Sequence, residues 1–377
     1  MSEDHLLYKV ALSMVPGIGG VLARTLVAHV GSVEGIFREP ERALMKIPGI
    51  GEVNARRIRE GDHLARAEQE LRFVARRGLR IFFYLDEGYP HRFRNCDDAP
   101  VLFYYLGKAS LDAAKTVSIV GTRHATDYGR QMCDELLQAL AGRGYDLLVV
   151  SGLAYGIDIQ AHRSSLKYKM PTVGVLAHGF DRMYPSEHAR TAEAMLEQGG
   201  LLTDFPSKSR IDPPNFIRRN RLIAGLGDVT VVVESGEKGG ALITADIAGS
   251  YNREVCAFPG RANDPRSKGC NYLVKKNLAV MIENAEDLEY ALGWDPPAKK
   301  PEPMQKLLFT ELNEVEQKVA SLLGGSEKIH IDLLAHSLDM PVRKVSSLLL
   351  ELECKGDRTS TRLNSSHPIR YRMPSSD

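Results

Sequence analysis

Short apolar runs alternate with helical patterns through the middle of the chain. Five such runs, several rich in valine, occupy residues 117–120, 147–150, 172–176, 229–233 and 254–258. After the first run, Met132, Leu136 and Leu140 recur at helical spacing. Strands buried on both faces read as continuous apolar runs, and helices connect such strands when they are parallel. The pattern predicts an α/β fold, an extended Rossmann-like doubly wound sheet over residues 76–295.

The first part of the chain contains a short repeat. Residues 15–19 read Val-Pro-Gly-Ile-Gly and residues 47–51 read Ile-Pro-Gly-Ile-Gly, each followed by a helical pattern. This predicts a helix-hairpin-helix (SAM-like) domain over residues 1–75. A glycine-bounded turn before a helix can offer backbone N–H groups to a phosphate. The same turns also serve to pack a small helical domain, and the sequence leaves both roles open.

The last part of the chain consists of three segments that differ in composition. Residues 296–304 are rich in proline and cannot continue a helix, so we expect a linker. Residues 305–356 carry three short amphipathic patterns, the helical half of a winged helix. No pattern for the wing follows, and we expect this winged-helix-like domain to be truncated. Residues 357–377 resemble the translation of a sequencing-library adapter, so we expect this tail to be a sequencing artefact. The alternative is a disordered polar tail, which the composition also allows.

Composition narrows the class of protein. No apolar stretch approaches the roughly 20 residues that span a bilayer, and the first residues lack the order of a signal peptide. We therefore expect a cytoplasmic protein without a membrane partner. The cysteines are odd in number, scattered and without a C-x-x-C pair, so we expect reduced structural thiols, no metal site and no cofactor. They are Cys96, Cys133, Cys256, Cys270 and Cys354.

Charge points to local clusters rather than to the whole chain. The formal net charge of +1 gives no global electrostatic case for nucleic acid. Eight arginines lie between Arg56 and Arg80, but acids interleave with them and a solvated helix face is the alternative. Between Lys208 and Arg221, five basic residues stand against Asp212 alone. The second cluster is the stronger candidate.

Four segments follow predicted strands and are expected at the carboxyl edge of the sheet, where open α/β sheets bind ligands. The first contains Gly121, Thr122 and Arg123. The glycine lets the backbone approach a ligand, and the hydroxyl and guanidinium groups are good phosphate partners. Arg123 alone would be an ordinary surface arginine, but the combination makes it the leading candidate for a phosphate contact.

The second segment, residues 151–162, begins with Ser151 and Gly152 and opens a helix. Its glycines and the N–H groups of a helix N-terminus form a concave set of donors that suits an anion. We interpret Asp158 as an N-cap rather than an acid catalyst. We interpret His162 as a buried, hydrogen-bonded residue rather than a ligand.

The third segment joins an aromatic residue, Phe216, to a basic stretch. The stretch consists of Arg218, Arg219, Asn220 and Arg221. A bound single strand needs charge for its backbone and a ring for base stacking, and this segment supplies both. The alternative is that Phe216 belongs to the core while Arg219 and Arg221 form ion pairs.

The fourth segment is a second glycine-rich loop before a helix. It contains Lys238, Gly239 and Gly240, with the lysine as a point charge beside possible backbone donors. Such a loop alone is a weak signal. Four phosphate-friendly segments on one sheet edge are difficult to explain as packing, and together they predict a DNA-binding site.

Ordered motifs in and around these segments resemble the DNA-processing protein A (DprA, or Smf) family, up to about residue 356. The resemblance implies binding of single-stranded DNA, loading of the recombinase RecA in natural transformation, and homodimers formed through the Rossmann-like domain. It also places the family's functional arginine and aromatic on Arg123 and Phe216. The motifs include Tyr89-Pro90, Val120-Gly121-Thr122-Arg123, Ser151-Gly152-Leu153-Ala154, Tyr184-Pro185, Arg219-Asn220-Arg221-Leu222-Ile223-Ala224-Gly225-Leu226 and Pro259-Gly260.

Two stretches depart from the family's pattern. Residues 239–244 read Gly-Gly-Ala-Leu-Ile-Thr where the family usually has S-G-S-L-I-T. Residues 203–206 read Thr-Asp-Phe-Pro where the family usually has S-E-x-P. Charges and backbone donors remain in both, so DNA binding is still expected.

Enzymes on similar sheets are the alternatives. The first alternative is a nucleotide-binding or nucleoside-monophosphate phosphoribohydrolase-like enzyme. Such an enzyme would carry a P-G-G-x-G-T-x-x-E loop. The corresponding loop here has no glutamate at that place, and the nearest acid, Asp246, is displaced from it. A dinucleotide-binding dehydrogenase needs G-x-G-x-x-G after the first strand, and an ATPase needs G-x-x-x-x-G-K-[ST]; neither motif occurs. We therefore expect a non-enzymatic DNA-binding protein.

Overall fold

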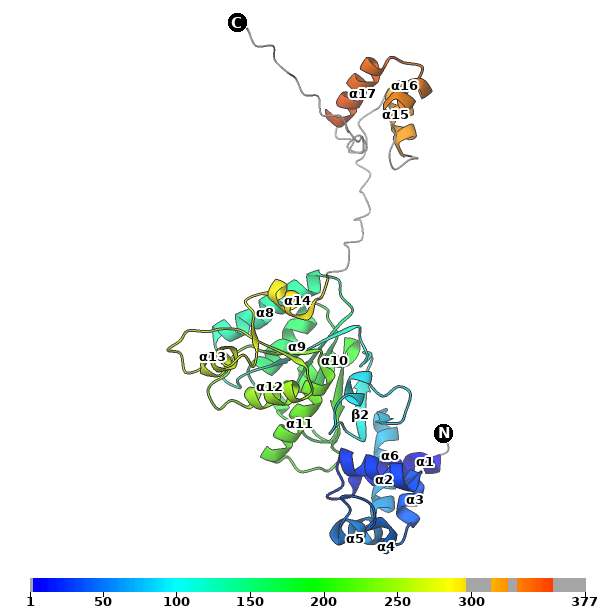
Figure 1. Ribbon diagram of the computed structural model, residues 1–377, viewed down its shortest axis with the longest axis vertical. Coiled ribbons are helices and arrows are strands. Elements are labelled where there is room, and N and C mark those ends of the chain that lie inside the picture. The colour runs from blue at the N-terminus through cyan, green and yellow to red at the C-terminus, as the bar shows by residue number, and fades with distance from the viewer. Residues whose placement is uncertain (1–2, 296–312, 325–330, 355–377) are drawn as a thin grey trace. The chain divides into compact units, whose positions relative to one another are not determined.

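The computed structural model describes residues 3–295, 313–324 and 331–354 (Figure 1). The chain divides into two compact units, Met1–Lys299 and Lys300–Asp377. The linker expected at 296–304 and the tail expected at 357–377 lie outside the described residues. No helix within the described ranges has both the length and the apolar character needed to cross a membrane.

Over residues 3–77 the chain forms six helices. The repeated turns lie where they were expected: residues 15–19 join the first two helices, and residues 47–51 join the fourth to the fifth. Each repeat is thus a turn between helices, as in a helix-hairpin-helix unit. The helices are α1 (Glu3–Met14), α2 (Gly20–Val30), α3 (Val33–Arg38), α4 (Glu41–Leu44), α5 (Glu52–Glu60) and α6 (His63–Arg77).

A nine-stranded sheet follows, in the order β1-β2-β6-β5-β4-β3-β7-β8-β9. Neighbours from β6 to β9 are parallel, whereas β1, β2 and β6 pair antiparallel. The five predicted runs are β3, β4, β5, β7 and β8, which confirms the extended Rossmann-like fold. The strands are β1 (Arg80–Phe83), β2 (Leu102–Gly107), β3 (Lys115–Val120), β4 (Leu147–Ser151), β5 (Thr172–Val175), β6 (Gly200–Thr203), β7 (Val229–Val232), β8 (Glu254–Ala257) and β9 (Val280–Met281).

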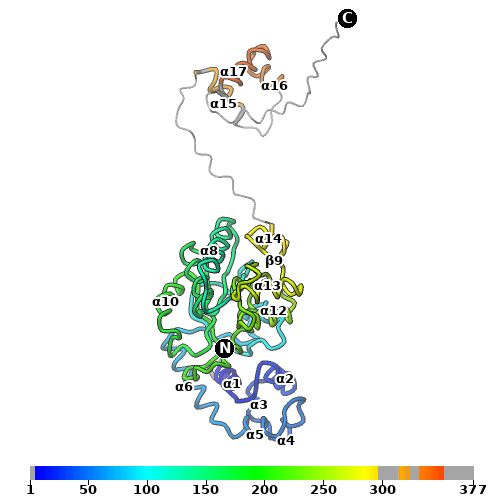
Figure 2. Tube along the Cα trace, turned by 90° about the vertical axis from the view of Figure 1, so that its left-hand side faces the viewer, coloured from blue at the N-terminus to red at the C-terminus, as the bar shows by residue number. Residues whose placement is uncertain are grey.

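Helices cover both faces of the sheet. Successive residues of a strand point to opposite faces, and in the central strands both sets are apolar and need cover. Val120, Val150 and Val232 face α11, α12 and α13, while Ile119 and Val149 face α8, α9 and α14. Figure 2 shows α12 and α13 on one side and α8 and α10 on the other. The bounds are α7 (His91–Arg94), α8 (Asp127–Gly142), α9 (Ile157–Lys167), the 3-10 helix η1 (Ser186–His188), α10 (Ala189–Gln198), α11 (Pro213–Leu226), α12 (Gly240–Ser250), α13 (Lys268–Lys275) and α14 (Ala285–Leu292).

The helical part and the sheet share one hydrophobic core across the boundary expected at residue 75. Phe83 and Tyr104, on β1 and β2, are buried together with Leu12, Leu26 and Ile36 of the helices. The boundary itself falls within α6. Apolar burial of this kind stabilises a fixed arrangement, so the hairpins form a layer held on the β1–β2 end of the sheet.

Within residues 313–324 and 331–354, the second unit forms three short helices, as the amphipathic patterns predict. They are α15 (Glu314–Gly324), α16 (Ile331–Ser337) and α17 (Val342–Cys354). Their small core contains Val319, Leu334, Ala335, Val345 and Leu349.

The cysteine side chains that the structure describes are buried free thiols: Cys96, Cys133, Cys256 and Cys270. This confirms the expectation of structural thiols for these four. Burial raises the pKa of the Cys256 and Cys270 thiols to about 12. Among the described residues, no group of three or more His, Cys, Asp or Glu side chains is placed to hold a metal ion.

A buried ion pair ties the segment before β2 to the sheet. Arg92 is 3% exposed, and its Nε and Nη2 donate to the two carboxylate oxygens of Asp228 at 2.7 and 2.8 Å. Arg92 Nη1 also donates to the carbonyl of Ala113 at 3.0 Å. The Asp228 carboxylate accepts from the backbone N–H of Thr116 on β3 at 2.7 Å. Removing the carboxylate would leave a buried guanidinium without its counter-charge.

We expect the substitution Asp228→Ala to lower the free energy of unfolding by about 3 kcal/mol, because it strands the buried Arg92 charge. Urea denaturation followed by the fluorescence of Trp294 measures this. The matched control is Asp127→Ala, which removes an exposed partner of Arg130 at 2.7 Å. It should cost less than about 1 kcal/mol. Equal effects of the two substitutions would contradict the structural importance of the Arg92–Asp228 pair.

Candidate nucleic-acid interface

The topological switch point of the sheet lies between β3 and β7. The chain winds from β3 through β4 and β5 to β6, then crosses back to place β7 on the other side of β3. At such a point the loops that leave two neighbouring strands diverge and open a crevice at the carboxyl edge. The loops after β3 (121–126) and β7 (233–239) border this crevice. Two of the four predicted segments therefore lie together.

The first segment is fixed by the close approach of three loops. The N–H of Thr122 donates to the carbonyl of Glu234 at 2.7 Å, and the N–H of Ile157 donates to the carbonyl of Thr122 at 3.1 Å. A Cβ atom at Gly121 would lie 2.5 Å from Ile157 Cγ1, so the position requires glycine. With the backbone held on both sides, the exposed Arg123 follows at a defined place on the edge.

A buried acid, Glu234, joins the two loops of the crevice. Its carboxylate accepts from the N–H and the hydroxyl of Thr126, each at 2.9 Å. The Thr126 hydroxyl in turn caps α8 by accepting from the N–H of Gly129 at 3.2 Å. Glu234 is only 2% exposed, so its role is to hold the loops rather than to contact a ligand.

Arg123 lies beside the ring of Phe216, a contact that the sequence analysis did not predict. Its guanidinium carbon is 5.3 Å from the centre of that ring, within the range of a cation–π contact. Tyr184, which is 45% exposed, stands edge-on to Phe216 with 5.8 Å between ring centres. Phe216 itself is half-buried. A guanidinium and two aromatic rings thus stand together at the edge of the sheet.

The second segment turns inward at its first residue. The Ser151 hydroxyl is buried and donates to the carbonyl of Ile119 at 2.6 Å. A Cβ atom at Gly152 would lie 2.6 Å from Asp158 Oδ2, so the buried Asp158 carboxylate lies beside the start of this segment.

Asp158 and His162 have structural roles. Asp158 is not the N-cap that we expected, because α9 begins after Gly156 and the acid lies in its first turn. Burial raises the pKa of the Asp158 carboxyl, while Arg219 and the backbone N–H groups oppose that shift. His162 is fully buried and shares a 2.7 Å hydrogen bond with Thr172 Oγ1, which confirms the prediction for it. Burial lowers the pKa of His162 to about 3, so the ring is neutral.

Arg219 is a buried brace rather than a surface contact. It is 3% exposed, and its Nη1 donates to the carbonyls of Gly152, at 2.5 Å, and Val175. Burial lowers its pKa to about 10, and the nearby Asp158 acts in the opposite direction. A Cβ atom at Gly152 would lie 2.7 Å from the Arg219 guanidinium carbon, so the guanidinium packs directly against the backbone of Gly152. The arginine joins the loops after β4 and β5.

The neighbouring arginines divide between structure and surface. Arg221 pairs with the carboxylate of Asp204 and donates to the carbonyl of Asp98. This agrees with the ion-pair alternative, and it gives Asp204 of the departing Thr-Asp-Phe-Pro stretch a structural role. Arg218 is 57% exposed and lies 3.8 Å from Asp204, a weak surface pair. Asn220, one turn after Phe216 on α11, is half-buried.

The fourth segment keeps its charge at the surface. Lys238 is exposed just before Gly239, which is the N-cap of α12, and Gly240 opens that helix. The loop leaves β7 on the far side of the crevice from α9. Of the predicted contacts, the structure thus brings together Gly121, Thr122, Arg123 and Phe216 at the edge, with Arg218 and Lys238 exposed on adjoining elements.

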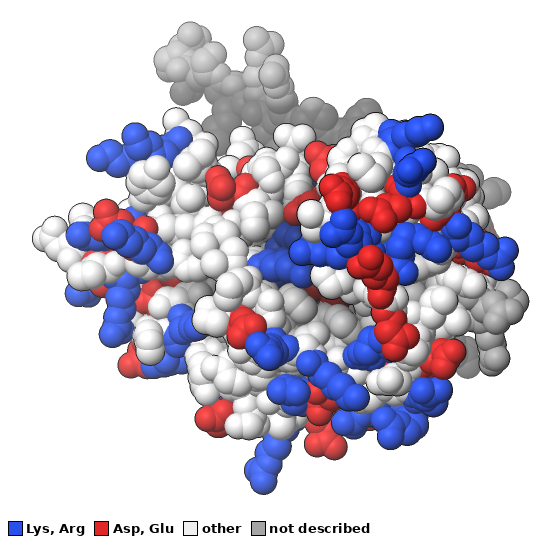
Figure 3. Space-filling view, turned by 90° about the horizontal axis from the view of Figure 1, so that it is seen from below, with Lys and Arg blue, Asp and Glu red and all other residues white. Residues whose placement is uncertain are grey.

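Basic and acidic side chains are mixed on the face of the molecule at the end where α4 and α5 lie (Figure 3).

Reasoning from the sequence missed Glu234 and Tyr184 as members of this site. Glu234 directly follows a fully apolar run in the sequence. An acid that is buried beside such a strand needs hydrogen-bond donors, and this could have indicated its structural role. Tyr184 lies 32 positions before Phe216 in the chain, and no local pattern indicates that their rings meet.

Comparison with known proteins agrees with this architecture. The pattern of the family described as DNA recombination-mediator protein A matches residues 80–293. The pattern of a SAM-like helix-hairpin-helix tandem matches residues 10–61, and that of the DprA winged helix domain matches residues 297–358. The matches cover the three predicted folded parts in the predicted order.

Individual proteins agree as well. The chain is 33% identical over 344 residues to the putative DNA processing protein DprA of Mycobacterium tuberculosis, covering 88% of this chain and 86% of that protein. It resembles the X-ray structure of DNA processing protein A from Streptococcus pneumoniae with a TM-score of 0.65 and 27% identity, over 77% of this chain and 98% of that one.

A second solved structure is DNA processing protein A from Helicobacter pylori, which is described as having a unique single-stranded DNA binding mode. Its TM-score is 0.52 at 28% identity, over 58% of this chain and 97% of that one. The fold, the ordered matches and the identity over most of the length lead to one conclusion. The chain belongs to the DprA/Smf family of DNA-processing proteins.

Proposed function

We propose that this protein binds single-stranded DNA without sequence preference at the switch-point edge and loads the recombinase RecA on incoming DNA during natural transformation. The observation that carries the proposal is the exposed Arg123 guanidinium held 5.3 Å from the centre of the Phe216 ring. A guanidinium suits a phosphate, and a ring suits an unstacked base. A single strand offers both a phosphate and an unstacked base, whereas a duplex keeps its bases stacked.

The family supports the same reading. Its description as a recombination mediator favours RecA as the protein partner, and the Helicobacter pylori relative is described as binding single-stranded DNA. We propose that Gly121 and Thr122 place the phosphate beside Arg123, and that Arg218, Asn220 and Lys238 extend the contact along the strand.

Asp158 and His162 are the candidates for acid or base catalysis in this part of the molecule, and their positions favour a binding protein over an enzyme. Asp158 is 7% exposed and His162 is fully buried. Neither can touch a substrate as it stands. The enzyme alternative is tested by incubating the protein with nucleoside monophosphates and searching for free base, and release of base would overturn the non-enzymatic reading.

We propose further that the protein acts as a cytoplasmic homodimer formed along the edge strand β9. Leu278, Val280 and Met281 expose 54%, 41% and 49% of their surface beside this strand. In the described chain β9 is the last strand of the sheet, so its outer backbone groups are unpaired within it. An exposed apolar edge strand is a template for a second copy.

The direct test of the proposal compares oligo-dT with a duplex of equal length in a gel-shift assay. We expect the single strand to bind more tightly, because the paired strand cannot present a base to Phe216. Equal affinity for the two would overturn the proposed preference for single strands.

Arg123→Ala should weaken binding to unrelated single strands and lower the slope of log affinity against log salt by about 0.7, the value for one phosphate contact on a single strand. Fluorescence anisotropy at several salt concentrations measures both. Arg163→Ala removes an exposed arginine from the middle of α9 and is the matched control. Identical isotherms for Arg123→Ala and the wild type would remove Arg123 from the interface.

Phe216→Leu should weaken binding by roughly five- to 150-fold without changing the salt slope, since stacking contributes about 1–3 kcal/mol per base and releases no counterions. A strand with abasic positions should bind the wild type and this variant alike. Tyr290→Leu removes a 91% exposed ring on α14 and should have no effect. A fall in the salt slope for Phe216→Leu would argue against a stacking role.

Met281→Lys should convert the dimer to a monomer in sedimentation velocity, because a charge on the edge strand opposes pairing with a second copy. Far-UV circular dichroism checks that the fold is retained. The control is Leu85→Lys, a 62% exposed position after β1 at the other end of the sheet. An unchanged sedimentation coefficient for Met281→Lys would exclude this edge as the interface.

A further inference from the structure

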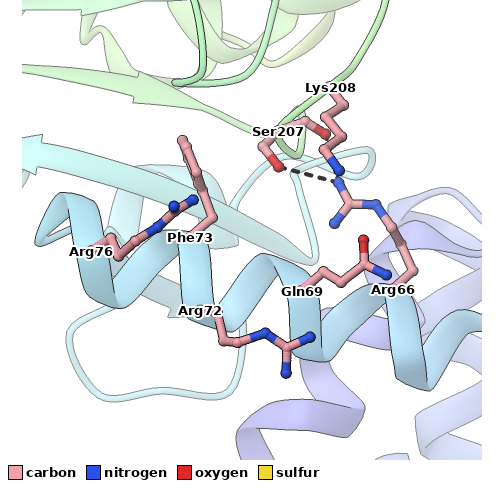
Figure 4. A pocket seen from close by; sticks show the side chains of 7 residues that line it. All are labelled: Arg66, Gln69, Arg72, Phe73, Arg76, Ser207 and Lys208. Carbon is pink, nitrogen blue, oxygen red and sulfur yellow. Dashed lines mark hydrogen bonds between the residues drawn. The ribbon is translucent and has the colours of Figure 1, made fainter.

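A second basic pocket lies between α6 and the loop after β6, away from the switch-point crevice. Its volume is about 310 Å³. In Figure 4, Arg66 and Phe73 of α6 extend toward the loop that carries Ser207 and Lys208, whereas Arg72 points away from that loop. Its lining contains four basic residues and no acidic one. The residues are Arg66, Gln69, Arg72, Phe73, Arg76, Ser207 and Lys208.

Helical spacing brings the α6 residues to one face. Arg66, Gln69 and Phe73 follow one another at intervals of three and four, and Arg76 continues the row. Acids of the same helix, such as Glu68, are not part of this lining. The two basic clusters of the sequence, one before residue 80 and one after residue 208, therefore meet here.

Arg66 closes one end of the pocket. It donates to Glu70 Oε2 at 3.0 Å and to the Ser207 carbonyl at 2.6 Å. Glu70 is 1% exposed, and its carboxylate also accepts from the N–H of Ser207 at 2.8 Å. One positive charge of the pocket is therefore compensated, and these bonds fix the loop that presents Lys208.

Lys208 has an unusual backbone conformation. Its φ is +65°, in the left-handed region where a residue with a Cβ atom is disfavoured and glycine is at ease. The bond from its N–H to Asp181 Oδ1, at 2.9 Å, holds this conformation. Its exposed ammonium makes no hydrogen bond or ion pair within the described chain. Strained positions that persist in a structure often serve a function, and here the strain presents a free cation at the pocket.

Two further cations and a ring complete the pocket. Arg72 lies 3.8 Å from Glu68, and both side chains are more than half exposed, so this pair is weak. The Arg76 guanidinium carbon lies 6.0 Å from the centre of the half-buried Phe73 ring. Three available cations beside an aromatic ring repeat the combination found at Arg123 and Phe216.

The two places lie along one edge of the sheet. The loop of Lys208 leaves the carboxyl end of β6, and β6 is separated from β3 by β5 and β4. Three strand spacings amount to about 14 Å. The same loop leads into α11, which carries Phe216. A single strand that leaves the switch-point edge can therefore reach the pocket.

We propose that this pocket binds phosphodiester groups of the same single strand that is held at Arg123 and Phe216, and so extends the binding site across the sheet to α6. The inference rests on the proposed function, because it names a second contact for the same ligand. Lys208, Arg72 and Arg76 contact the phosphates, and Phe73 offers its ring to a base.

The test measures fluorescence anisotropy with oligo-dT of about 2 nucleotides, too short to span the roughly 14 Å between the two places at about 3.4 Å per nucleotide, and of about 16 nucleotides, the upper end of the range for single-strand-binding domains. Lys208→Gly is the first variant, since glycine accepts the left-handed backbone and only the charge is lost. We expect it to weaken binding of the long strand roughly fivefold or more and to lower its salt slope by about 0.7. The short strand, held at the switch-point edge, should bind this variant as it binds the wild type.

The double substitution Arg72→Gln with Arg76→Gln gives an independent measurement on α6. It should lower the salt slope for the long strand by about 1.4, two contacts of about 0.7 each. Arg163→Gln with Arg190→Gln removes two exposed arginines from α9 and α10 and is the matched control. Both pocket variants should retain the thermal unfolding midpoint of the wild type.

The outcomes separate the two proposals. If Lys208→Gly and the α6 variant bind the long strand as the wild type does, or weaken both lengths equally, the pocket does not hold the continuing strand. If inorganic phosphate protects the wild type from thermal unfolding but neither variant alters long-strand binding, the pocket is a site for free phosphate and the proposal fails. If the wild type binds neither length, the proposed function fails and the extended site fails with it.

Discussion

The loops at the switch-point edge depend on a small set of hydrogen bonds between the ends of β3 and β7. Glu234 at the end of β7 accepts from Thr122 through its carbonyl and from Thr126 through its carboxylate. These bonds tie the loop after β3 to the loop after β7, although the strands are more than a hundred residues apart in sequence. Because the acid is buried, it has no water to replace these donors. The place of Arg123 at the edge follows from them.

A second constraint joins the helical hairpins to the sheet. Apolar residues of α1 to α3 share a core with β1 and β2, and Glu70 of α6 binds the loop after β6. The hairpins therefore cannot move independently of the sheet edge without exposing that core. This fixed arrangement places the α6 arginines opposite Lys208, so that clusters from two sequence regions form one surface.

Burial decided which of the predicted contacts remain available. In the stretch from Arg218 to Arg221 the sequence shows three similar arginines, yet one is exposed, one is a buried brace and one is paired with Asp204. Helical periodicity distributes successive residues around α11, and only the neighbouring loops determine which direction is solvent. Asp158 is a similar case, since the sequence suggested an N-cap and the structure places a buried carboxylate in the first turn of α9. The local sequence alone does not tell whether a polar side chain will bind other groups of the protein or remain available to a ligand.

The sequence by itself determined the α/β fold, the five central parallel strands, the paired helical hairpins and the helices of the second unit, because periodicity and turn residues are local properties. It also indicated Arg123 and Phe216 through motifs and chemistry. It did not reveal β1, β2, β6 and β9, whose apolar runs are short or mixed. Of these, β1, β2 and β6 pair antiparallel. Only the tertiary structure decided that Tyr184 joins Phe216, that Arg219 is internal, and that α6 faces Lys208. Each of these depends on contacts between distant residues, and such contacts follow from packing of the whole chain rather than from any local pattern.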